Sequence, residues 1–396
     1  MNFSNLKKCM DELVSDELRP SVDVAVYRNH ELLYRYFTGV MDIENGGEIK
    51  GDEQYFIYSM TKMITCCCAL QLLEQGKYGL DDEISKWLPE FSKMKITADA
   101  LNTENAKKIA SGQSVGENVD VTDDGYAKTP ITVKHLFTMT AGLDYSLYDD
   151  VLRNAAAEGK KTTQELVCAM ANKTLGFEPG TRFRYSLCHD VLGALIEIWS
   201  GETLGNYMSK NVFEPLGMKN TFFGVPEDKS KMPSLYSYFG NPPVFKKEAL
   251  KCVYNISPEY ESGGAGLTST TEDYALFLDM VACGGVGKTG ARILKEETVK
   301  LWGTNHVSGA AADDFDEMRR GYGYGLGVRV HMRPETSGTI SPVGEFGWDG
   351  AAGAFSMVDP INHVSLTYFQ NIMGNSPDQS AIRNALYKDL GTSNEN

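Results

Sequence analysis

The chain has 396 residues, 42% of them hydrophobic, and a formal net charge of −15 at pH 7. This length suffices for two or three domains with a large buried core. Such an acidic chain lacks the basic surface that nucleic acids and anionic membranes require, so we expect neither as a partner. No segment approaches the roughly 20 apolar residues of a membrane span, and residues 1–8 lack the apolar core of a signal peptide.

The eight cysteines include three consecutive residues at positions 66–68, and none belongs to a Cys-x-x-Cys pair. This pattern is typical of small core residues in a reducing compartment, rather than of disulfides or metal ligands. We therefore predict a cytoplasmic protein with no metal site and no cofactor, and the sequence leaves the oligomeric state open.

The first half of the chain begins with elements of a mixed fold. The pattern predicts an amphipathic helix at residues 3–18 and a β-hairpin with strands at 22–27 and 32–37. Apolar residues then cover every face between residues 60 and 75, which predicts a buried helix that ends at Gly76. Residues 80–225 are mostly helical and rich in loops, with a polar excursion at 97–129.

The second half returns to strands. Short apolar runs at 322–330, 343–348, 353–358 and 364–370 predict strands, and residues 376–390 predict a closing helix. This order favours an α+β fold, in which both chain ends form an antiparallel sheet flanked by helices and a mostly helical domain is inserted. We expect a sheet domain of residues 1–85 plus 226–396 and a helical domain of residues 86–225.

The most informative motif is Ser-x-x-Lys at Ser59 and Lys62, at the start of the predicted buried helix. Residues three apart on a helix are neighbours, at roughly 5 to 6 Å between Cβ atoms, so the amine can reach the hydroxyl. Burial would lower the pKa of Lys62 and make it a base near neutral pH, while backbone N–H groups at the helix start favour an oxyanion. The same spacing at residues 4–7 and 92–95 lacks apolar surroundings. The alternative is that Ser59 only caps the helix and Lys62 extends to solvent.

Tyr185 is the second candidate, because it follows Pro-Gly-Thr at 179–181 and precedes a helix that ends at Gly201. Beside a cationic Lys62 its phenolate would be favoured, and the side chain could relay a proton to a leaving group. A tyrosine taken alone is more often a packing residue.

Three other strings imitate functional motifs. Residues 112–116 match a nucleophile elbow around Ser114, but the polar residues that follow cannot form the required helix. Residues 282–289 approximate a phosphate-binding loop, yet they follow a helical pattern where a strand is needed. Lys-Thr-Gly at 288–290 lies in the same segment. We expect surface loops at all three, which makes an ATPase a remote alternative.

Several strings in one order resemble the class C β-lactamase-like serine hydrolases, a superfamily with penicillin-binding proteins, carboxypeptidases, D-aminopeptidases, family VIII carboxylesterases and acyltransferases. Besides Ser-x-x-Lys and Tyr-Ser at 185–186, they are Leu-Asp-Asp at 80–82, Trp-Leu-Pro at 87–89, Thr-Ala-Gly-Leu at 140–143, Glu-Pro-Leu-Gly-Met at 214–218 and Gly-Gly-Ala-Gly-Leu at 263–267. The resemblance implies a β-lactamase/transpeptidase-like fold. It also implies that Ser59 is the nucleophile, Lys62 its base and Tyr185 the second proton carrier.

The chain departs from the family at its second motif. Tyr-x-Asn becomes Tyr-Ser-Leu, so Leu187 stands where an amide would contact the substrate. His189 could partly replace that amide, although such a histidine more often packs or meets solvent. His135 is likewise expected to be structural.

The third motif falls on Gly-Trp-Asp-Gly at 347–350, between two predicted strands. Trp348 then replaces the cation that holds a substrate carboxylate, and Asp349 adds negative charge, which counts against anionic substrates but allows pairing with an amine. By the same resemblance Gly350 belongs to the substrate-binding turn, and the backbone N–H groups of Ser59 and Ala351 form the oxyanion hole.

These residues predict a serine hydrolase that forms an acyl-enzyme on Ser59. An esterase or amidase acting on small substrates that need no carboxylate fits best. The alternatives are a β-lactamase, a D-Ala-D-Ala carboxypeptidase or D-aminopeptidase, an acyltransferase, and a weakly active penicillin-binding sensor.

Overall fold

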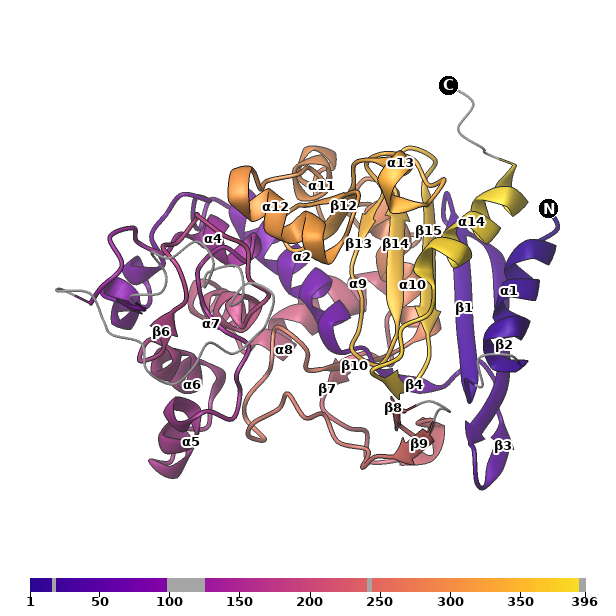
Figure 1. Cartoon of the computed structure of the whole chain (residues 1–396), viewed down its shortest axis with the longest axis horizontal. Helices are drawn as coiled ribbons and strands as arrows, with labels where there is room; N and C mark the ends of the chain where they lie inside the picture. Colours follow the sequence, from indigo (N-terminus) through magenta and orange to yellow (C-terminus); the bar gives the residue numbers. More distant parts are fainter. Residues whose placement is uncertain (16–18, 98–124, 241–243, 392–396) are drawn as a thin grey trace.

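An eight-stranded sheet joins the two ends of the chain. The computed structural model describes residues 1–15, 19–97, 125–240 and 244–391, and its main sheet has the order β11-β12-β13-β14-β15-β1-β2-β3 (Figure 1). Each neighbouring pair in this sheet is antiparallel. The predicted α+β fold, with its sheet built from both chain ends, is therefore confirmed.

The predicted N-terminal hairpin is formed by β1 (Ser21–Arg28) and β2 (Glu31–Asp42). Its turn residues Asn29 and His30 have φ angles of 49° and 67°. Two successive residues in this left-handed region give the twist that two-residue hairpins favour. On its other edge β1 pairs with β15 (Val364–Phe369), so nearly all of β1 is buried.

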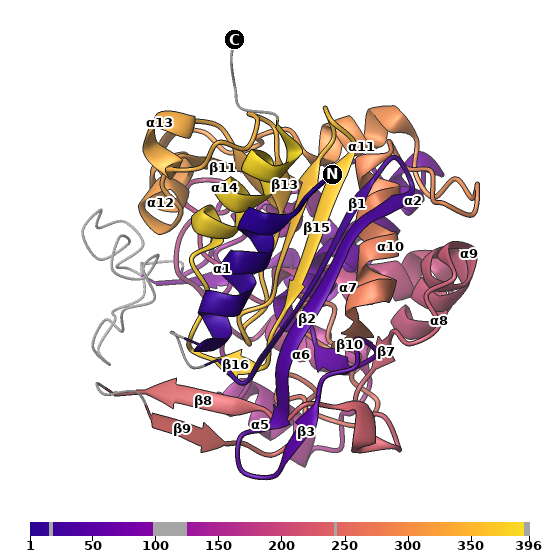
Figure 2. The ribbon, with the colours of Figure 1, turned by 90° about the vertical axis from the view of Figure 1, so that its right-hand side faces the viewer.

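Helices cover both faces of the sheet. Figure 2 shows α1 (Ser4–Ser15) and α14 (Gln379–Leu390) on one side of the strands and α10 (Thr271–Ala282) on the other. On α1 the buried residues Leu6, Met10 and Leu13 recur at helical spacing, as expected for one apolar stripe. The predicted helices at the two ends are thus confirmed, with shorter bounds.

The C-terminal strands contain one wrong prediction. Residues 322–330 form two strands, β11 (Tyr322–Tyr324) and β12 (Arg329–His331), rather than one. The reason is the link between them, where Gly327 has a φ of 89° and turns the chain back. The runs that follow correspond to β13 (Phe346–Gly347), β14 (Phe355–Asp359) and β15.

The predicted buried helix is α2 (Thr61–Glu74), preceded by the short 3₁₀ helix η1 (Tyr58–Met60). The other described helices are α4 (Val133–Phe137), α5 (Asp150–Ala157), α6 (Thr163–Met170), α7 (Cys188–Ser200), α8 (Leu204–Met208), α9 (Glu214–Leu216), α11 (Glu296–Trp302), α12 (Gly309–Met318) and α13 (Pro334–Ser337). The other strands are β3 (Gly46–Glu48), β4 (Gln54–Phe56), β5 (Lys95–Ile96), β6 (Thr174–Leu175), β7 (Phe222–Phe223), β8 (Tyr236–Phe239), β9 (Val244–Lys247), β10 (Leu267–Thr270) and β16 (Ile372–Met373).

The middle of the chain supplies α4 to α9, as the sequence predicts. One continuous hydrophobic cluster nevertheless runs from α2 through α7 to α10 and α11. The domain boundaries after residues 85 and 225 therefore stay a prediction. None of the described helices combines the length and the apolar character needed to cross a bilayer.

The structure places the strings that imitate functional motifs. Residues 112–116, with Ser114, lie outside the described residues, as does most of the polar excursion. The phosphate-loop string begins where α10 ends, and Lys-Thr-Gly at 288–290 lies in a turn, so both are loops as predicted. Residues 4–7 lie on α1, where Lys7 pairs with Asp11. Ser92 ends the short 3₁₀ helix Pro89–Ser92, so residues 92–95 do not lie together on one helix.

Candidate active site

Ser59 and Lys62 lie at the entrance of a helix that is buried on all sides. Ser59 is in η1, and Lys62 is in the first turn of α2, whose residues 61–70 are all buried. Ser59 retains 8% exposure, whereas Lys62 is completely inaccessible. The lysine therefore does not extend to solvent, which contradicts the alternative that its amine is a solvated surface group.

The amine of Lys62 is held by three oxygens. Its Nζ lies 3.3 Å from Ser59 Oγ, 3.1 Å from Tyr145 Oη and 2.6 Å from the carbonyl oxygen of Gly264. Burial lowers the pKa of Lys62 to about 7, although the charge of Asp190 opposes this shift. A substantial fraction of the amine is therefore uncharged near neutral pH and can accept a proton from the serine.

Tyr185 precedes α7 and faces the same hydroxyl. Its oxygen accepts a hydrogen bond of 3.0 Å from Trp348 Nε1, and its ring lies 4.7 Å from Lys62 Nζ. Burial raises the pKa of Tyr185 far above its ordinary value, more than hydrogen bonds with Ser59 and Trp348 lower it. The expectation of a favoured phenolate is therefore wrong, because desolvation outweighs the hydrogen bonds that favour the anion, and Tyr185 is a neutral phenol that can donate.

Sequence reasoning missed Tyr145, which touches the same two groups. Its hydroxyl bonds to Lys62, its ring stacks on Tyr185 at 5.3 Å between centroids, and it also hydrogen-bonds with Ser59. A signal was present, because Tyr-Ser-Leu occurs at 145–147 as well as at 185–187. The site therefore holds two stacked tyrosines where one was expected.

The Gly-Trp-Asp-Gly turn packs directly against the segment before the serine. A Cβ atom on Gly350 would lie 2.6 Å from the carbonyl oxygen of Ile57, so only glycine allows this approach. The approach brings Ala351 to the same cleft as Ser59. This is where the predicted oxyanion hole, formed by the backbone of Ser59 and Ala351, would have to lie.

Asp349 carries a compensated charge. It forms ion pairs with Arg319 and Arg329, the latter at 2.8 Å. Burial opposes ionisation, but the two arginines outweigh it and hold the pKa of Asp349 below its usual value. Asp349 therefore gives less support for an amine-bearing substrate than the sequence indicated.

Two predicted substrate contacts lie behind the site. Leu187 is 1% exposed at the start of α7, and His189 is completely buried with Nε2 at 3.7 Å from Cys66 Sγ. Burial lowers the pKa of His189 to about 3, so it is neutral. Neither lines the cleft, and His189 packs instead of replacing the missing amide. His135 caps α4 through Thr132, which confirms its structural role.

The cleft at Ser59 has a volume of about 590 Å³, and three tyrosines and a tryptophan are among the residues of its walls. It brings together most of the predicted site residues with others that the sequence did not indicate. Its lining comprises Ser59, Tyr145, Tyr185, Tyr254, Met318, Arg319, Trp348, Asp349, Gly350, Ala351 and Ser376. The arrangement can deliver a serine oxygen, a buried amine and two phenols to one carbonyl group.

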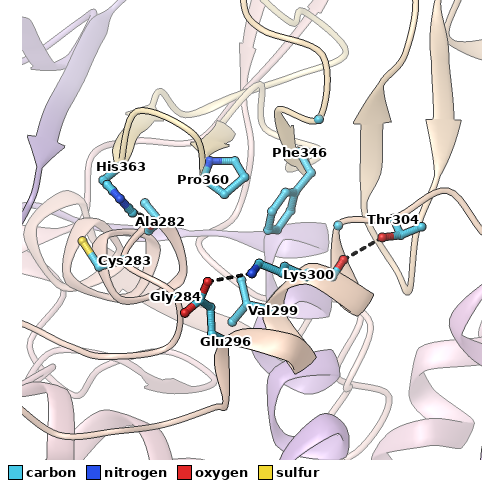
Figure 3. Close-up of a pocket in the computed structure, with 12 residues that line it drawn as sticks. Ala282, Cys283, Gly284, Glu296, Val299, Lys300, Thr304, Phe346, Pro360 and His363 are labelled. Atoms are coloured by element: carbon cyan, nitrogen blue, oxygen red, sulfur yellow. Dashed lines mark hydrogen bonds and ion pairs between the residues drawn. The ribbon is translucent and has the colours of Figure 1, made fainter.

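A second cavity, of about 490 Å³, lies between the end of α10, α11 and the β14–β15 turn (Figure 3). Its polar groups are already engaged. Lys300 pairs with Glu296 at 2.7 Å, and His363 Nδ1 bonds to the carbonyl oxygen of Ala282 at 2.9 Å. No residue that the sequence singled out for the site lines this cavity, so the candidate active site is the cleft at Ser59.

The chain shows a clear relationship to known proteins. A family model described as Beta-lactamase matches residues 6–389. Esterase EstB of Burkholderia gladioli is 26% identical over 418 residues, covering 97% of this chain and 95% of EstB. A putative D-alanyl-D-alanine carboxypeptidase of Escherichia coli is 25% identical over 395 residues, covering 91% of this chain and 81% of that protein.

Among solved structures, EstCE1, described as a hydrolase with promiscuous acyltransferase activity, has a TM-score of 0.77. It is 24% identical in sequence, and the match covers 97% of both chains, which shows the shared fold. The family match over nearly the whole chain means that this protein belongs to the β-lactamase family of serine hydrolases, as the resemblance predicted.

Proposed function

We propose that the protein is an esterase or amidase that acts on small substrates without a required carboxylate, through an acyl-enzyme on Ser59. One observation carries the proposal: the inaccessible Lys62 amine lies 3.3 Å from Ser59 Oγ and its pKa is about 7. An uncharged amine at this distance is the base that a serine nucleophile needs.

The reaction begins when Ser59 Oγ attacks the carbonyl carbon and its proton passes to Lys62 Nζ. The carbonyl oxygen becomes an oxyanion, which the backbone N–H groups of Ser59 and Ala351 would stabilise. The lysine proton then reaches the leaving group through a tyrosine hydroxyl, and the leaving group departs as an alcohol or amine. Water attacks the acyl-enzyme in the reverse sequence and regenerates Ser59.

The preference for uncharged substrates is supported by the cleft wall. Trp348 is 5% exposed, and its Nε1 already donates to Tyr185. This position therefore supplies no cation that could hold a substrate carboxylate. Tyr254, Met318 and Trp348 add apolar surface that suits an apolar acyl or alcohol group. Arg319 also lines the cleft, but it is paired with Asp349.

A cytoplasmic location is part of the same proposal. All eight cysteines lie in the described part of the chain, and none of them forms a disulfide there. Eight cysteines without a disulfide fit a reducing compartment.

Hydrolysis of a short-chain p-nitrophenyl ester tests the proposal. We expect Ser59→Ala to abolish turnover and labelling by a fluorophosphonate, because no nucleophile remains. Ser92→Ala is the matched control, since Ser92 belongs to another Ser-x-x-Lys spacing, and it should keep full activity. Equal activity in Ser59→Ala and the wild type would refute the assignment.

Further assays on the same protein distinguish the alternatives. Nitrocefin turnover that rivals ester turnover would indicate a β-lactamase. Release of D-alanine or another D-amino acid from a peptide would indicate a carboxypeptidase or a D-aminopeptidase. Faster acyl transfer to an added alcohol than to water would indicate an acyltransferase. A stable penicillin adduct without turnover, detected by intact mass, would indicate a sensor.

A further inference from the structure

The Lys62 amine faces a buried carboxylate, Asp190, which the family motifs do not include. Asp190 lies on α7, and only 1% of it is exposed. Its Oδ1 accepts hydrogen bonds from Tyr260 Oη at 2.8 Å and Ser262 Oγ at 2.6 Å. Its Oδ2 is buried and has no hydrogen-bond partner among the described residues. A buried carboxylate oxygen that accepts no hydrogen bond lowers the stability of the fold.

The open oxygen and the lysine amine meet at one glycine. A Cβ atom on Gly264 would lie 2.5 Å from Asp190 Oδ2 and 3.3 Å from Lys62 Nζ. Lys62 also donates to the carbonyl oxygen of Gly264. Because residue 264 is a glycine, no side chain of that residue stands between the Asp190 carboxylate and the Lys62 amine.

The other titratable groups around Lys62 are neutral near pH 7. Burial raises the pKa of Cys66 well above its ordinary value, that of Cys188 to about 11, and that of Tyr145 well above its ordinary value. Tyr185 is a neutral phenol, and His189 is a neutral imidazole with a pKa of about 3. Among the described groups that act on Lys62, Asp190 is therefore the one that supplies a negative charge.

We propose that Asp190 is a positioning residue that sets the charge state of Lys62 and stabilises the ammonium formed when Ser59 gives up its proton. This inference rests on the proposed function. The proton moves from Ser59 Oγ to Lys62 Nζ, and Asp190 remains a carboxylate throughout. Full burial without this carboxylate would leave the new ammonium with no counter-charge.

The negative charge of Asp190 raises the pKa of Lys62, and this direction determines the expected pH dependence. In the wild type, acylation should rise with pH through about pH 7, because the free amine forms as Lys62 loses its proton. Asp190→Asn removes a charge that favours the ammonium, so the pKa of Lys62 should fall by about one unit. The weaker base should also lower the plateau acylation rate roughly tenfold.

Asparagine keeps the shape of Asp190 and an oxygen for Tyr260 and Ser262. The matched control is Glu197→Gln, a change of the same kind on the same helix, at a carboxylate that bonds to Leu204 and Gln164 instead. The pKa of Lys62 can be measured directly on the full chain by NMR of ¹³Cε-labelled lysine, with the signal assigned by its loss in Lys62→Met. The pH dependence of Ser59 labelling by a fluorophosphonate gives the matching rate.

The proposal is supported if Asp190→Asn lowers the lysine pKa while Glu197→Gln leaves it unchanged, and it is overturned if both variants titrate like the wild type. If Asp190→Asn fails to fold, Tyr260→Phe decides. Loss of that donor leaves more negative charge facing Lys62, so its pKa should rise by roughly half a unit, and an unchanged or lower pKa would overturn the proposal. A lysine pKa that shifts as expected in a chain without ester turnover would refute the proposed function but support this pairing.

Discussion

Two tyrosines at the nucleophile have different surroundings, and this difference assigns them different tasks. Tyr185 Oη receives the indole N–H of Trp348, so its own hydrogen is free to point toward the serine and the leaving group. Tyr145 Oη receives a hydrogen bond from Lys62 instead. We therefore propose that Tyr185 protonates the leaving group and that Tyr145 positions the lysine.

This assignment predicts a dependence on the leaving group. Tyr185→Phe should lower kcat for an alkyl ester about 100-fold and for a p-nitrophenyl ester less than about tenfold, because p-nitrophenolate leaves without a proton. Tyr145→Phe should affect both esters to the same extent. Tyr254→Phe, in the wall of the same cleft, is the control and should change neither strongly. Equal losses on both esters for Tyr185→Phe would contradict its role as the acid.

The residues that could be predicted from the sequence are those with a fixed spacing or a motif. Ser59 and Lys62 are three apart in the continuous helical stretch of η1 and α2, so their contact follows from helix geometry. Tyr145, Asp190 and Gly264 come from separate segments, and only the fold brings them to the lysine. The arginine partners of Asp349 were missed for the same reason.

Between elements, the decisive contact joins the β13–β14 turn to the segment before η1. Gly350 lies against the carbonyl of Ile57, two residues before Ser59. The distance between this turn and Ser59, and with it the proposed oxyanion hole, therefore depends on the absence of a side chain at residue 350.

We expect Gly350→Ala to lower kcat/KM roughly 100-fold, since its Cβ would force the turn away from Ser59 by a fraction of an ångström to an ångström. Gly79→Ala is the control, because a Cβ there meets nothing closer than 3.6 Å. Circular dichroism and thermal unfolding should show that both variants fold. Wild-type kcat/KM in Gly350→Ala would mean that the turn does not set the geometry of the site.

The elements themselves were predictable where periodicity and stop signals agree. The N-terminal hairpin, α2 and α14 follow from alternating or helical apolar patterns that end at polar or glycine residues. Residues 322–330 misled the prediction because the aromatic and aliphatic run continues across the glycines of the turn. Short strands with internal glycines carry too little pattern to separate two strands from one.

Across the whole molecule, buried charges connect α14 to the cleft. Arg383 Nε lies 3.1 Å from Glu345, Glu345 lies 3.4 Å from Arg329, and Arg329 lies 2.8 Å from Asp349. Arg383, Glu345 and Arg329 are almost completely buried. The last helix of the chain therefore helps to hold the turn that lines the active-site cleft.

Removing one member of this network should be costly. Arg383→Met should lower the free energy of unfolding by about 3 kcal/mol, because Glu345 loses a buried partner. Lys388→Met, at an exposed position of the same helix, should change it by less than about 0.5 kcal/mol. Urea unfolding followed by fluorescence measures both. A loss for Arg383→Met no larger than that for the control would show that Arg329 alone suffices for Glu345.

The overall architecture was predictable because the strand signals that we recognised lie near the two chain ends and the family motifs occur in order. The short link of the hairpin indicates that β2 is one neighbour of β1, but nothing local specifies that β15 is the other. The charge network was hidden as well, because its members come from β12, α14 and the segments on both sides of β13.

The placement of β1 beside β15 has a consequence for biosynthesis. The ribosome completes β1 at Arg28 long before it reaches β15 at Val364, so the strand that is buried between two neighbours waits for one of them. At about 5 to 20 residues per second, that wait lasts on the order of tens of seconds. During this interval one edge of an apolar hairpin is unpaired, and a nascent-chain chaperone would have to shield it from other chains.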